Sequence, residues 1–243
     1  NLVPNDTNGY RDIFYHDMVT GITKRASVNS AGEESDKGGD NPQISGNGNF
    51  VIYSSYATNL TTTYTYNDSQ VYVYDRLNET TEIASINNQG VANNNTVFTP
   101  TVSDDGRYVA FNGHGSTLGY SGQYEDNAFR RDRLTNTLEM ASSYNNTCLS
   151  GPGSSGVGDI SPDGRYIFYY LEFPVIPSDT NATYDVYIRD MNTATPISCT
   201  LSNLYSAKAW VGLANTADSG IKFDLRARIF KNGDLIGGDK VLS

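Results

Sequence analysis

The chain has few of the residues on which most metal and nucleophilic chemistry depends. Its 243 residues include two histidines, His16 and His114, and two cysteines, Cys148 and Cys199. These four lie far apart in the sequence, so the close ligand spacing of a zinc site is absent. The cysteines leave two alternatives open, a disulfide between adjacent repeats or two unpaired thiols.

Long apolar runs and positive charge are also scarce. The longest apolar run, residues 167–171, is far shorter than the ~20 residues that span a bilayer, so no membrane span is expected. The 27 acidic and 17 basic residues give a net charge of −10, which disfavours nucleic acid and anionic lipid as partners. Few lysines beside many Asn and Thr residues indicate an extracellular, periplasmic or cell-surface protein. With neither an initiator Met nor a signal peptide, the chain reads as a processed or trimmed product.

The abundant residues are those of strands and polar turns. The sequence contains 18 Tyr and 23 Gly, together with many Asn, Ser and Thr residues. This composition is typical of an all-β protein. No segment of consequence shows helical periodicity, so an all-β fold is predicted.

Two sequence phrases repeat with the same period. The first phrase contains a turn glycine, which recurs at equal intervals as Gly48, Gly106 and Gly164. The second phrase ends in an aspartate and recurs at the same interval, to within a single position, at Asp17, Asp75, Asp132 and Asp190. Two independent phrases that share one period indicate a repeat architecture.

Each full period contains four strand-like segments and no helix. The predicted strands are 41–45, 49–54, 70–75 and 81–86, then 98–103, 107–112, 127–132 and 137–142, then 157–161, 165–171, 184–190 and 195–200. Within 70–75, Val71 and Val73 alternate with Tyr72 and Tyr74, as in a sheet with two different faces. Four antiparallel strands per repeat predict a β-propeller blade.

The repeat resembles a known family. The segments SPDGRYIFYY at 161–170 and DVYIRDMNTATPISCT at 185–200 are similar to the TolB-type β-propeller repeat, which has Ser-Pro-Asp-Gly before its second strand and an aspartate at the end of its third. The resemblance covers roughly residues 1–203, and the first copy departs from it with Gly46-Asn47-Gly48. It implies a propeller fold and often a protein- or glycan-binding role, but no single activity.

The predicted domain organisation follows from the repeat. Residues 1–203 form the propeller, with a partial blade in 1–40 and full blades at 41–98, 99–156 and 157–203. Residues 204–243 do not follow the repeat, but their apolar and polar residues alternate as in strands, with a hairpin turn at Lys231-Asn-Gly-Asp. This tail either closes the first blade, which gives a monomer, or resembles the start of an immunoglobulin-like module. In the second case the open blade edges pair with another copy.

Antiparallel order places all the long connections on one face of the propeller, which is the predicted binding face. Its loops contain tyrosines beside Asn and Thr residues, and these tyrosines either bind a ligand or pack on neighbouring loops. The candidate ligand-binding residues are Tyr56, Tyr64, Tyr66, Tyr120 and Tyr124.

Calcium is the one specific cofactor hypothesis. The segment NDTNGYRD at 5–12 has alternating oxygen side chains, and SDTNATYD at 178–185 repeats the pattern in the last blade. Such oxygen ligands suit a hard cation, and the alternative is an Asx-type turn without an ion. The candidate ligands are Asp6, Asn8 and Asp12 in the first set, and Asp179, Asn181 and Asp185 in the second.

The sequence favours a non-catalytic module that binds a protein or a polysaccharide through the long-loop face. One alternative is a carbohydrate-active enzyme, a glycoside hydrolase or lyase. It would use loop carboxylates, of which Glu33, Glu34, Glu125, Asp126 and Glu172 are available. Another alternative is a purely structural repeat within a larger surface protein.

Overall fold

A computed structural model describes residues 2–63, 65, 67–114, 117–118, 126–142, 155–171 and 184–192, together with the backbone of 230–231 and 234–235. The chain divides into two compact units, Asn1–Ile197 and Ser198–Ser243. In the described part of the first unit every element is a strand, and within the described residues there is no helix that could cross a membrane.

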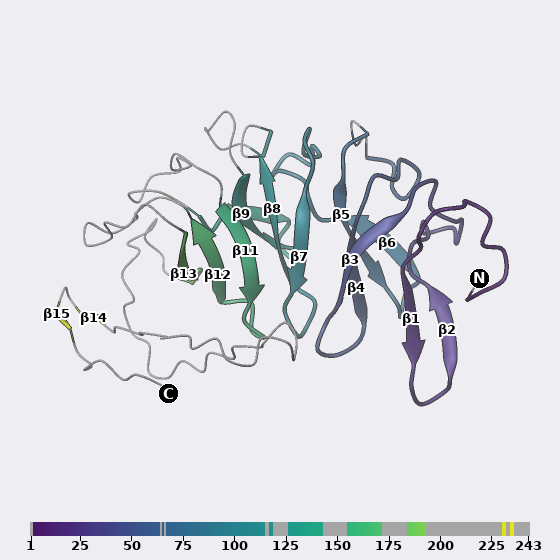
Figure 1. The fold of residues 1–243 in the computed structure, drawn as a ribbon, viewed down its shortest axis with the longest axis horizontal. Coiled ribbons are helices and arrows are strands. Elements are labelled where there is room, and N and C mark those ends of the chain that lie inside the picture. Colours follow the sequence, from purple (N-terminus) through teal and green to yellow (C-terminus); the bar gives the residue numbers. More distant parts are fainter. Residues whose placement is uncertain are drawn as a thin grey trace, which may run out of the picture. The chain divides into compact units, whose positions relative to one another are not determined.

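The first unit is a series of antiparallel sheets, one per repeat (Figure 1). A two-stranded sheet pairs β1 (Phe14–Asp17) with β2 (Ile22–Arg25). The next sheet has the order β3-β4-β5-β6, with β3 (Gly39–Ile44), β4 (Phe50–Ser55), β5 (Gln70–Asp75) and β6 (Thr80–Ile83). The third has the order β7-β8-β9-β10, with β7 (Phe98–Val102), β8 (Tyr108–His114), β9 (Asp126–Asp132) and β10 (Thr137–Met140). The fourth consists of β11 (Ser155–Ile160), β12 (Tyr166–Leu171) and β13 (Asp185–Asp190).

The predicted all-β propeller architecture is confirmed. Two blades show four antiparallel strands, and the predicted strands in the described residues lie within a few residues of the observed ones. The fourth strand of the last full blade, predicted at 195–200, lies outside the described residues. In the second unit, β14 (Phe230–Lys231) pairs with β15 (Asp234–Leu235), as the predicted hairpin requires. The rest of the tail, with both alternatives for its role, lies outside the described residues, as do both cysteines.

The repeated glycine phrase forms the turn between the first two strands of each blade. Asp105 accepts hydrogen bonds from the Ser103 hydroxyl (2.7 Å) and the Arg107 backbone N–H (2.9 Å). Gly106 has φ +75°, a left-handed conformation that glycine adopts without strain. Asn47 makes the same two bonds in the copy that lacks the aspartate, so the turn survives the substitution.

Alternate residues of each strand pack against opposite neighbouring blades. Tyr53 and Tyr72 belong to a core cluster shared with Ile13 of the first blade. Ile52 and Val73 belong to another cluster, shared with the third blade. The two-residue alternation in the sequence therefore corresponds to the two faces of each blade. A third cluster joins the third and fourth blades.

Short and long connections lie on opposite ends of the strands. The turns β1–β2 and β3–β4 lie at the lower edge of the sheets in Figure 1, and the longer connections lie at the upper edge. In the described part of the chain, the connections between strands at the lower edge have four or five residues, whereas 26–38, 56–69 and 84–97 are long. The predicted one-sided distribution of loops is present.

Candidate functional site

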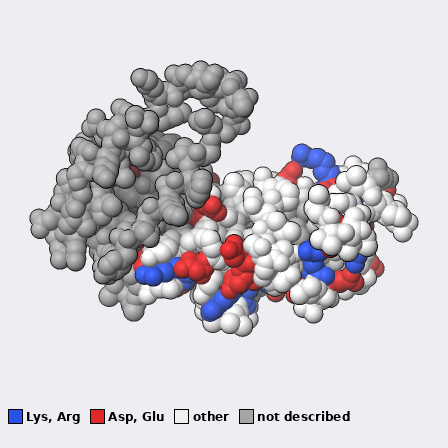
Figure 2. Space-filling view, turned by 90° about the horizontal axis from the view of Figure 1, so that it is seen from below, with Lys and Arg blue, Asp and Glu red and all other residues white. Residues whose placement is uncertain are grey.

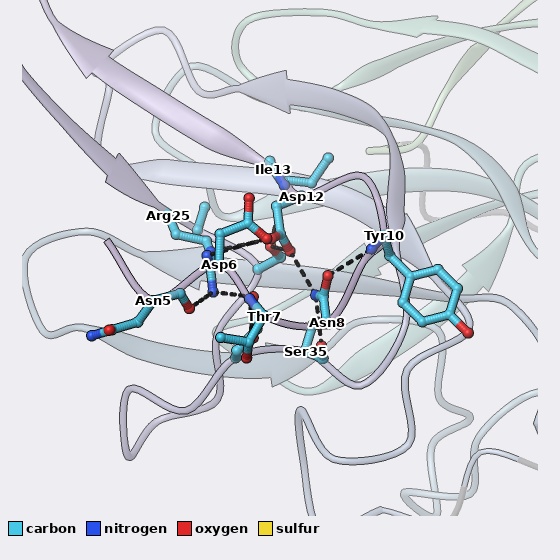
Figure 3. Close-up of polar contacts among 12 residues, drawn as sticks. Asn5, Asp6, Thr7, Asn8, Tyr10, Asp12, Ile13, Arg25 and Ser35 are labelled. Carbon is cyan, nitrogen blue, oxygen red and sulfur yellow. Dashed lines mark hydrogen bonds and ion pairs between the residues drawn. The ribbon is translucent and has the colours of Figure 1, made fainter. Parts of the chain in front are cut away.

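Three carboxylates converge beside the first sheet (Figure 3). Asp6 and Asp12 come from the segment before β1, and Glu34 comes from the connection between β2 and β3. One carboxylate oxygen of each residue lies within 4.8 Å of the others. We call Asp6, Asp12 and Glu34 the acidic cluster. Asp6 and Asp12 were predicted as metal ligands, whereas Glu34 was named only as an available loop carboxylate.

The guanidinium group of Arg25, the last residue of β2, contacts all three carboxylates. Its Nη1 lies 2.6 Å from Glu34 Oε1, its Nε 3.2 Å from Asp12 Oδ2, and its Nη2 3.8 Å from Asp6 Oδ1. The Asp12 and Arg25 side chains are only 1% and 8% exposed. Buried charges at this depth require such pairing, so Arg25 is the counter-ion of the acidic cluster.

Asn8, the third predicted ligand of this set, has a different role in the structure. Its side-chain oxygen accepts a hydrogen bond from the Tyr10 backbone N–H (2.7 Å), which makes an Asx turn. Its amide nitrogen donates to the Ser35 carbonyl (2.9 Å) and to Asp12 Oδ1 (3.3 Å). The structure thus shows the turn that was the alternative to a metal ligand at this position.

Asp12 also occupies a position that recurs in the other blades as a hydrogen-bond acceptor. It accepts a hydrogen bond from the Ser27 hydroxyl (2.7 Å), as Gln70 does from Ser85 (2.7 Å). Each of these serines also accepts a bond from a backbone N–H, that of Ile13 for Ser27 and that of Val71 for Ser85. The carboxylate at position 12 therefore stabilises the blade in addition to any role toward a cation.

Residue-by-residue comparison of the repeats would have revealed both Arg25 and Glu34. Arg25 stands where the next two blades have the buried apolar residues Ile83 and Met140, and Glu34 stands where the second blade has Ala92. A cation and an anion that replace apolar residues at two positions of the same repeat indicate a buried ion pair.

The environment of Glu34 favours its charged form. Burial by itself raises the pKa of this carboxyl. The hydrogen bonds from the backbone N–H of Thr7 (3.0 Å) and its hydroxyl (2.7 Å), together with the Arg25 guanidinium, outweigh burial and leave the pKa below its ordinary value. These contacts favour the ionised form of the Glu34 carboxylate beside the Arg25 guanidinium.

The second predicted metal set cannot be assembled in the same way. Asp185 begins β13, while Asp179 and Asn181 lie outside the described residues. Calcium ligation by either set stays a prediction, and among the described residues the acidic cluster is a group of oxygen ligands that could hold a metal ion.

Of the five predicted binding tyrosines, the structure describes Tyr56. It follows β4 directly and is 48% exposed, as a ligand-binding residue requires. The other four, Tyr64, Tyr66, Tyr120 and Tyr124, lie outside the described residues.

Sequence reasoning missed a pair of exposed tyrosines at the same end of the strands. Tyr170 lies near the end of β12, and Tyr184 immediately precedes β13. Their rings meet edge to face, with centroids 5.7 Å apart, and they are 42% and 56% exposed. Tyr170 stands opposite Gly156, where a Cβ atom would lie 2.0 Å from the tyrosine ring. In the sequence, the glycine at the position opposite a strand tyrosine could have revealed this pair.

Comparisons with known proteins find similarity in fold. No protein-family model matches the chain, and no curated protein matches its sequence. Similar solved structures include TolB from Acinetobacter baumannii, with 14% identity and a TM-score of 0.42 over 75% of this chain and 35% of that one. The β-propeller domain of the Trilobed protease from Pyrococcus furiosus is similar over 73% of this chain and 45% of that one, with 13% identity and a TM-score of 0.44. The tricorn protease is similar with 16% identity and a TM-score of 0.43, over 70% of this chain and 14% of that one. The chain thus spans about a third of the length of TolB.

Proposed function

We propose that the chain is a non-catalytic β-propeller module that binds a protein or a polysaccharide through the face with the long loops. The observation that carries this proposal is the contrast between the two faces. One face consists of short turns whose polar groups bind one another, and the other presents long connections with exposed aromatic side chains. We further propose an extracellular, periplasmic or cell-surface location, which suits such a module.

The short-turn face has two arginine–aspartate pairs that are engaged within the protein. Arg107 makes two hydrogen bonds to Asp132, at 2.9 and 2.7 Å, and Arg165 makes the equivalent pair to Asp190, at 2.9 and 2.6 Å. Figure 2, seen from the side of these turns, shows acidic and basic side chains next to each other across the described part. Charges that are neutralised in this way offer little to a ligand.

The long-loop end carries exposed tyrosines instead. Tyr56, Tyr170 and Tyr184 each present an aromatic ring to solvent. A tyrosine offers an apolar face for stacking and a hydroxyl for hydrogen bonding, which suits both sugar rings and protein surfaces.

Calcium is the proposed accessory ligand of the module. The acidic cluster supplies three carboxylate groups, the kind of ligand that calcium prefers. Because Arg25 already contacts all three, calcium binding would replace guanidinium contacts by metal–oxygen bonds. The cluster would then bring calcium near the long connection between β2 and β3.

An enzyme that uses loop carboxylates is the alternative, and the described carboxylates already have partners within the protein. Glu33 accepts a hydrogen bond from Asn29 (2.7 Å), Glu34 is paired with Arg25, and Asp126 lies 3.4 Å from His114 Nδ1. Glu125 and Glu172 lie outside the described residues. Turnover of a bound glycan that is abolished by Glu125→Gln or Asp126→Asn would establish the enzyme.

A glycan array and a panel of surface proteins test the proposal. We expect a hit whose binding is lost in Tyr170→Ala and Tyr184→Ala. Leu77→Ala is the matched control, because Leu77 is 72% exposed in a short turn at the opposite end of the strands. A ligand whose binding depends on Leu77 and tolerates both tyrosine substitutions would refute the assignment to this face.

A further inference from the structure

A cavity of about 250 Å³ lies between the second and third blades. The second blade contributes Glu82 and Ile83 of β6 and Thr61 of the β4–β5 connection. The third contributes Arg131 of β9 and Asn136 of the following turn. The cavity is distinct from the acidic cluster and from the exposed tyrosines.

Arg131 is almost completely buried and has a nitrogen without a partner. The residue is 3% exposed, and its Nη2 donates a hydrogen bond to Asn136 Oδ1 (3.1 Å). Its Nη1 is buried and has no hydrogen-bond partner within the described residues. An arginine nitrogen can only donate, so a missing partner must be an acceptor. An unsatisfied buried donor is costly, and a buried guanidinium more so.

The equivalent arginine of the next blade shows how this position is satisfied elsewhere. Arg189 stands one repeat after Arg131, at the same place in its strand, and its Nη1 donates to the Ala141 carbonyl (3.1 Å). Ala84, the counterpart of Ala141 in the second blade, also lines the cavity. The carbonyl bond made by Arg189 is not made by Arg131 Nη1, and Arg131 lines the cavity.

The neighbouring charges are committed to other partners. Glu82 pairs with Arg133, and the Arg133 guanidinium lies 4.3 Å from the centroid of the Phe50 ring. Asp132 is bound by Arg107 through two hydrogen bonds. Burial lowers the pKa of Arg131, the Glu82 and Asp132 carboxylates act in the opposite direction, and the guanidinium remains protonated. One positive charge is therefore left over at the cavity.

A second unsatisfied group lines the same cavity. The hydroxyl of Thr61 is buried and has no hydrogen-bond partner within the described residues. A hydroxyl donates one bond and accepts others, so it can bind the second oxygen of a ligand that already accepts a bond from Arg131. Ile83 and Ala84 contribute apolar side chains to the lining of the same cavity.

We propose that this cavity binds the carboxylate group of a small acidic ligand, with Arg131 Nη1 as the charged donor and Thr61 as the second hydrogen-bond partner. A single surplus positive charge matches a monoanion rather than a phosphate dianion. Charge-assisted bonds between guanidinium and carboxylate are among the strongest available. The volume suits a small ligand, either a free organic acid or one acidic sugar unit. This inference does not depend on the proposed function of the tyrosines.

Titrations of the full chain with acetate, glucuronate, glucose and inorganic phosphate test the inference by amide chemical-shift changes. We expect acetate or glucuronate to shift resonances around Thr61, Ile83 and Arg131, and glucose to have no effect. If both acids saturate the site, a free organic acid is sufficient for binding. If glucuronate alone saturates it, the ligand is an acidic sugar. No saturation by either acid below about 100 mM, or equal binding of glucose or phosphate, overturns the inference.

Three variants assign the binding to the cavity. Arg131→Gln and Thr61→Val should each weaken the binding of the acid by roughly tenfold or more, because each removes one bond to the carboxylate. Arg189→Gln is the matched control and should leave it unchanged. Thr61→Val keeps the buried arginine, so it remains informative if Arg131→Gln fails to fold. The assignment is overturned if Thr61→Val binds the acid as tightly as the unsubstituted protein does. It is also overturned if Thr61→Val and Arg189→Gln lose the same amount of affinity.

Discussion

The turn glycine Gly106 lies directly against the ring of Phe50 in the preceding blade. A Cβ atom at Gly106 would lie 2.0 Å from Phe50 Cδ2, and one at Gly164, one repeat further along, would lie equally close to Tyr108 Cδ2. Backbone hydrogen bonds link the same turns, from Asn47 N–H to the Asp104 carbonyl (2.9 Å). The repeated phrase thus joins neighbouring blades as well as the strands within one blade.

Gly106→Ala should destabilise the protein more than Gly48→Ala. The two glycines occupy equivalent turns with φ of +75° and +73°, so both substitutions incur the left-handed strain of about 1–2 kcal/mol. Only Gly106 faces an aromatic ring at clashing distance, whereas the nearest atom to a Cβ at Gly48 is Arg76 Nη1 at 3.6 Å. Chemical denaturation should show an additional loss of about 1–3 kcal/mol for Gly106→Ala. Equal losses would contradict the packing of the turn on Phe50.

Acid should weaken the Arg107–Asp132 pair in a defined pH range. Burial by itself raises the pKa of Asp132, but the bonds from Arg107, Thr135 and Leu134 lower it from 3.8 to about 2. A carboxyl whose folded pKa is depressed stabilises the protein above its unfolded pKa, and this contribution is lost as the pH falls toward 2. The loss amounts to at most about 2 kcal/mol.

Unfolding measured between pH 5 and pH 2 checks this expectation. The free energy of unfolding of Asp132→Asn should fall less over this range than that of the unsubstituted protein, and Arg107→Gln should show part of the same effect. Parallel pH profiles for all three proteins would contradict it.

Calcium should raise the stability of the chain if it binds the acidic cluster. A ligand that binds only the folded state at a hundredfold excess over its Kd adds about 2.7 kcal/mol. Thermal unfolding in calcium and in chelator measures this shift, which Asp6→Asn should reduce. Magnesium is the control ion, since it demands a tighter octahedral site. Identical unfolding temperatures in calcium and in chelator would show that Arg25 alone balances the cluster.

Ser85→Ala should cost more than its loss of volume suggests. The buried Ser85 hydroxyl donates to Gln70 Oε1 (2.7 Å) and accepts from the Val71 backbone N–H (3.0 Å). Both partners are buried, so the substitution leaves two unsatisfied groups and should reduce the free energy of unfolding by about 1–3 kcal/mol. Thr62→Ala, at an exposed residue, is the control. A similar small effect of both substitutions on denaturation would contradict this role of Ser85.

Local patterns predicted the blades well because each blade is built from neighbouring segments. The strands at 70–75 and 127–132 and the turns at Asp105 and Asp132 lie within a few residues of their prediction. Short-range alternation and turn chemistry depend on adjacent residues, which the sequence displays directly.

The candidate site was predicted only in part. Asp6 and Asp12 do lie together, but Arg25 and Glu34, which decide the electrostatics, come from later segments. Asn8 belongs to the turn chemistry of the segment, because its side-chain oxygen binds the Tyr10 N–H. Composition and spacing within 5–12 contain no information about the residues that later segments of the chain bring to this site.

By itself, the sequence determined the all-β class, the repeat and its period, the strands of each blade and the side on which the long loops lie. The tertiary structure alone decided how one blade packs on the next. Thr61 and Arg131 belong to different repeats, and only the packing of one blade on the next brings both to one cavity. Periodicity specifies which side of a strand faces a neighbouring blade, but whether a buried donor there finds an acceptor depends on backbone positions in that neighbour.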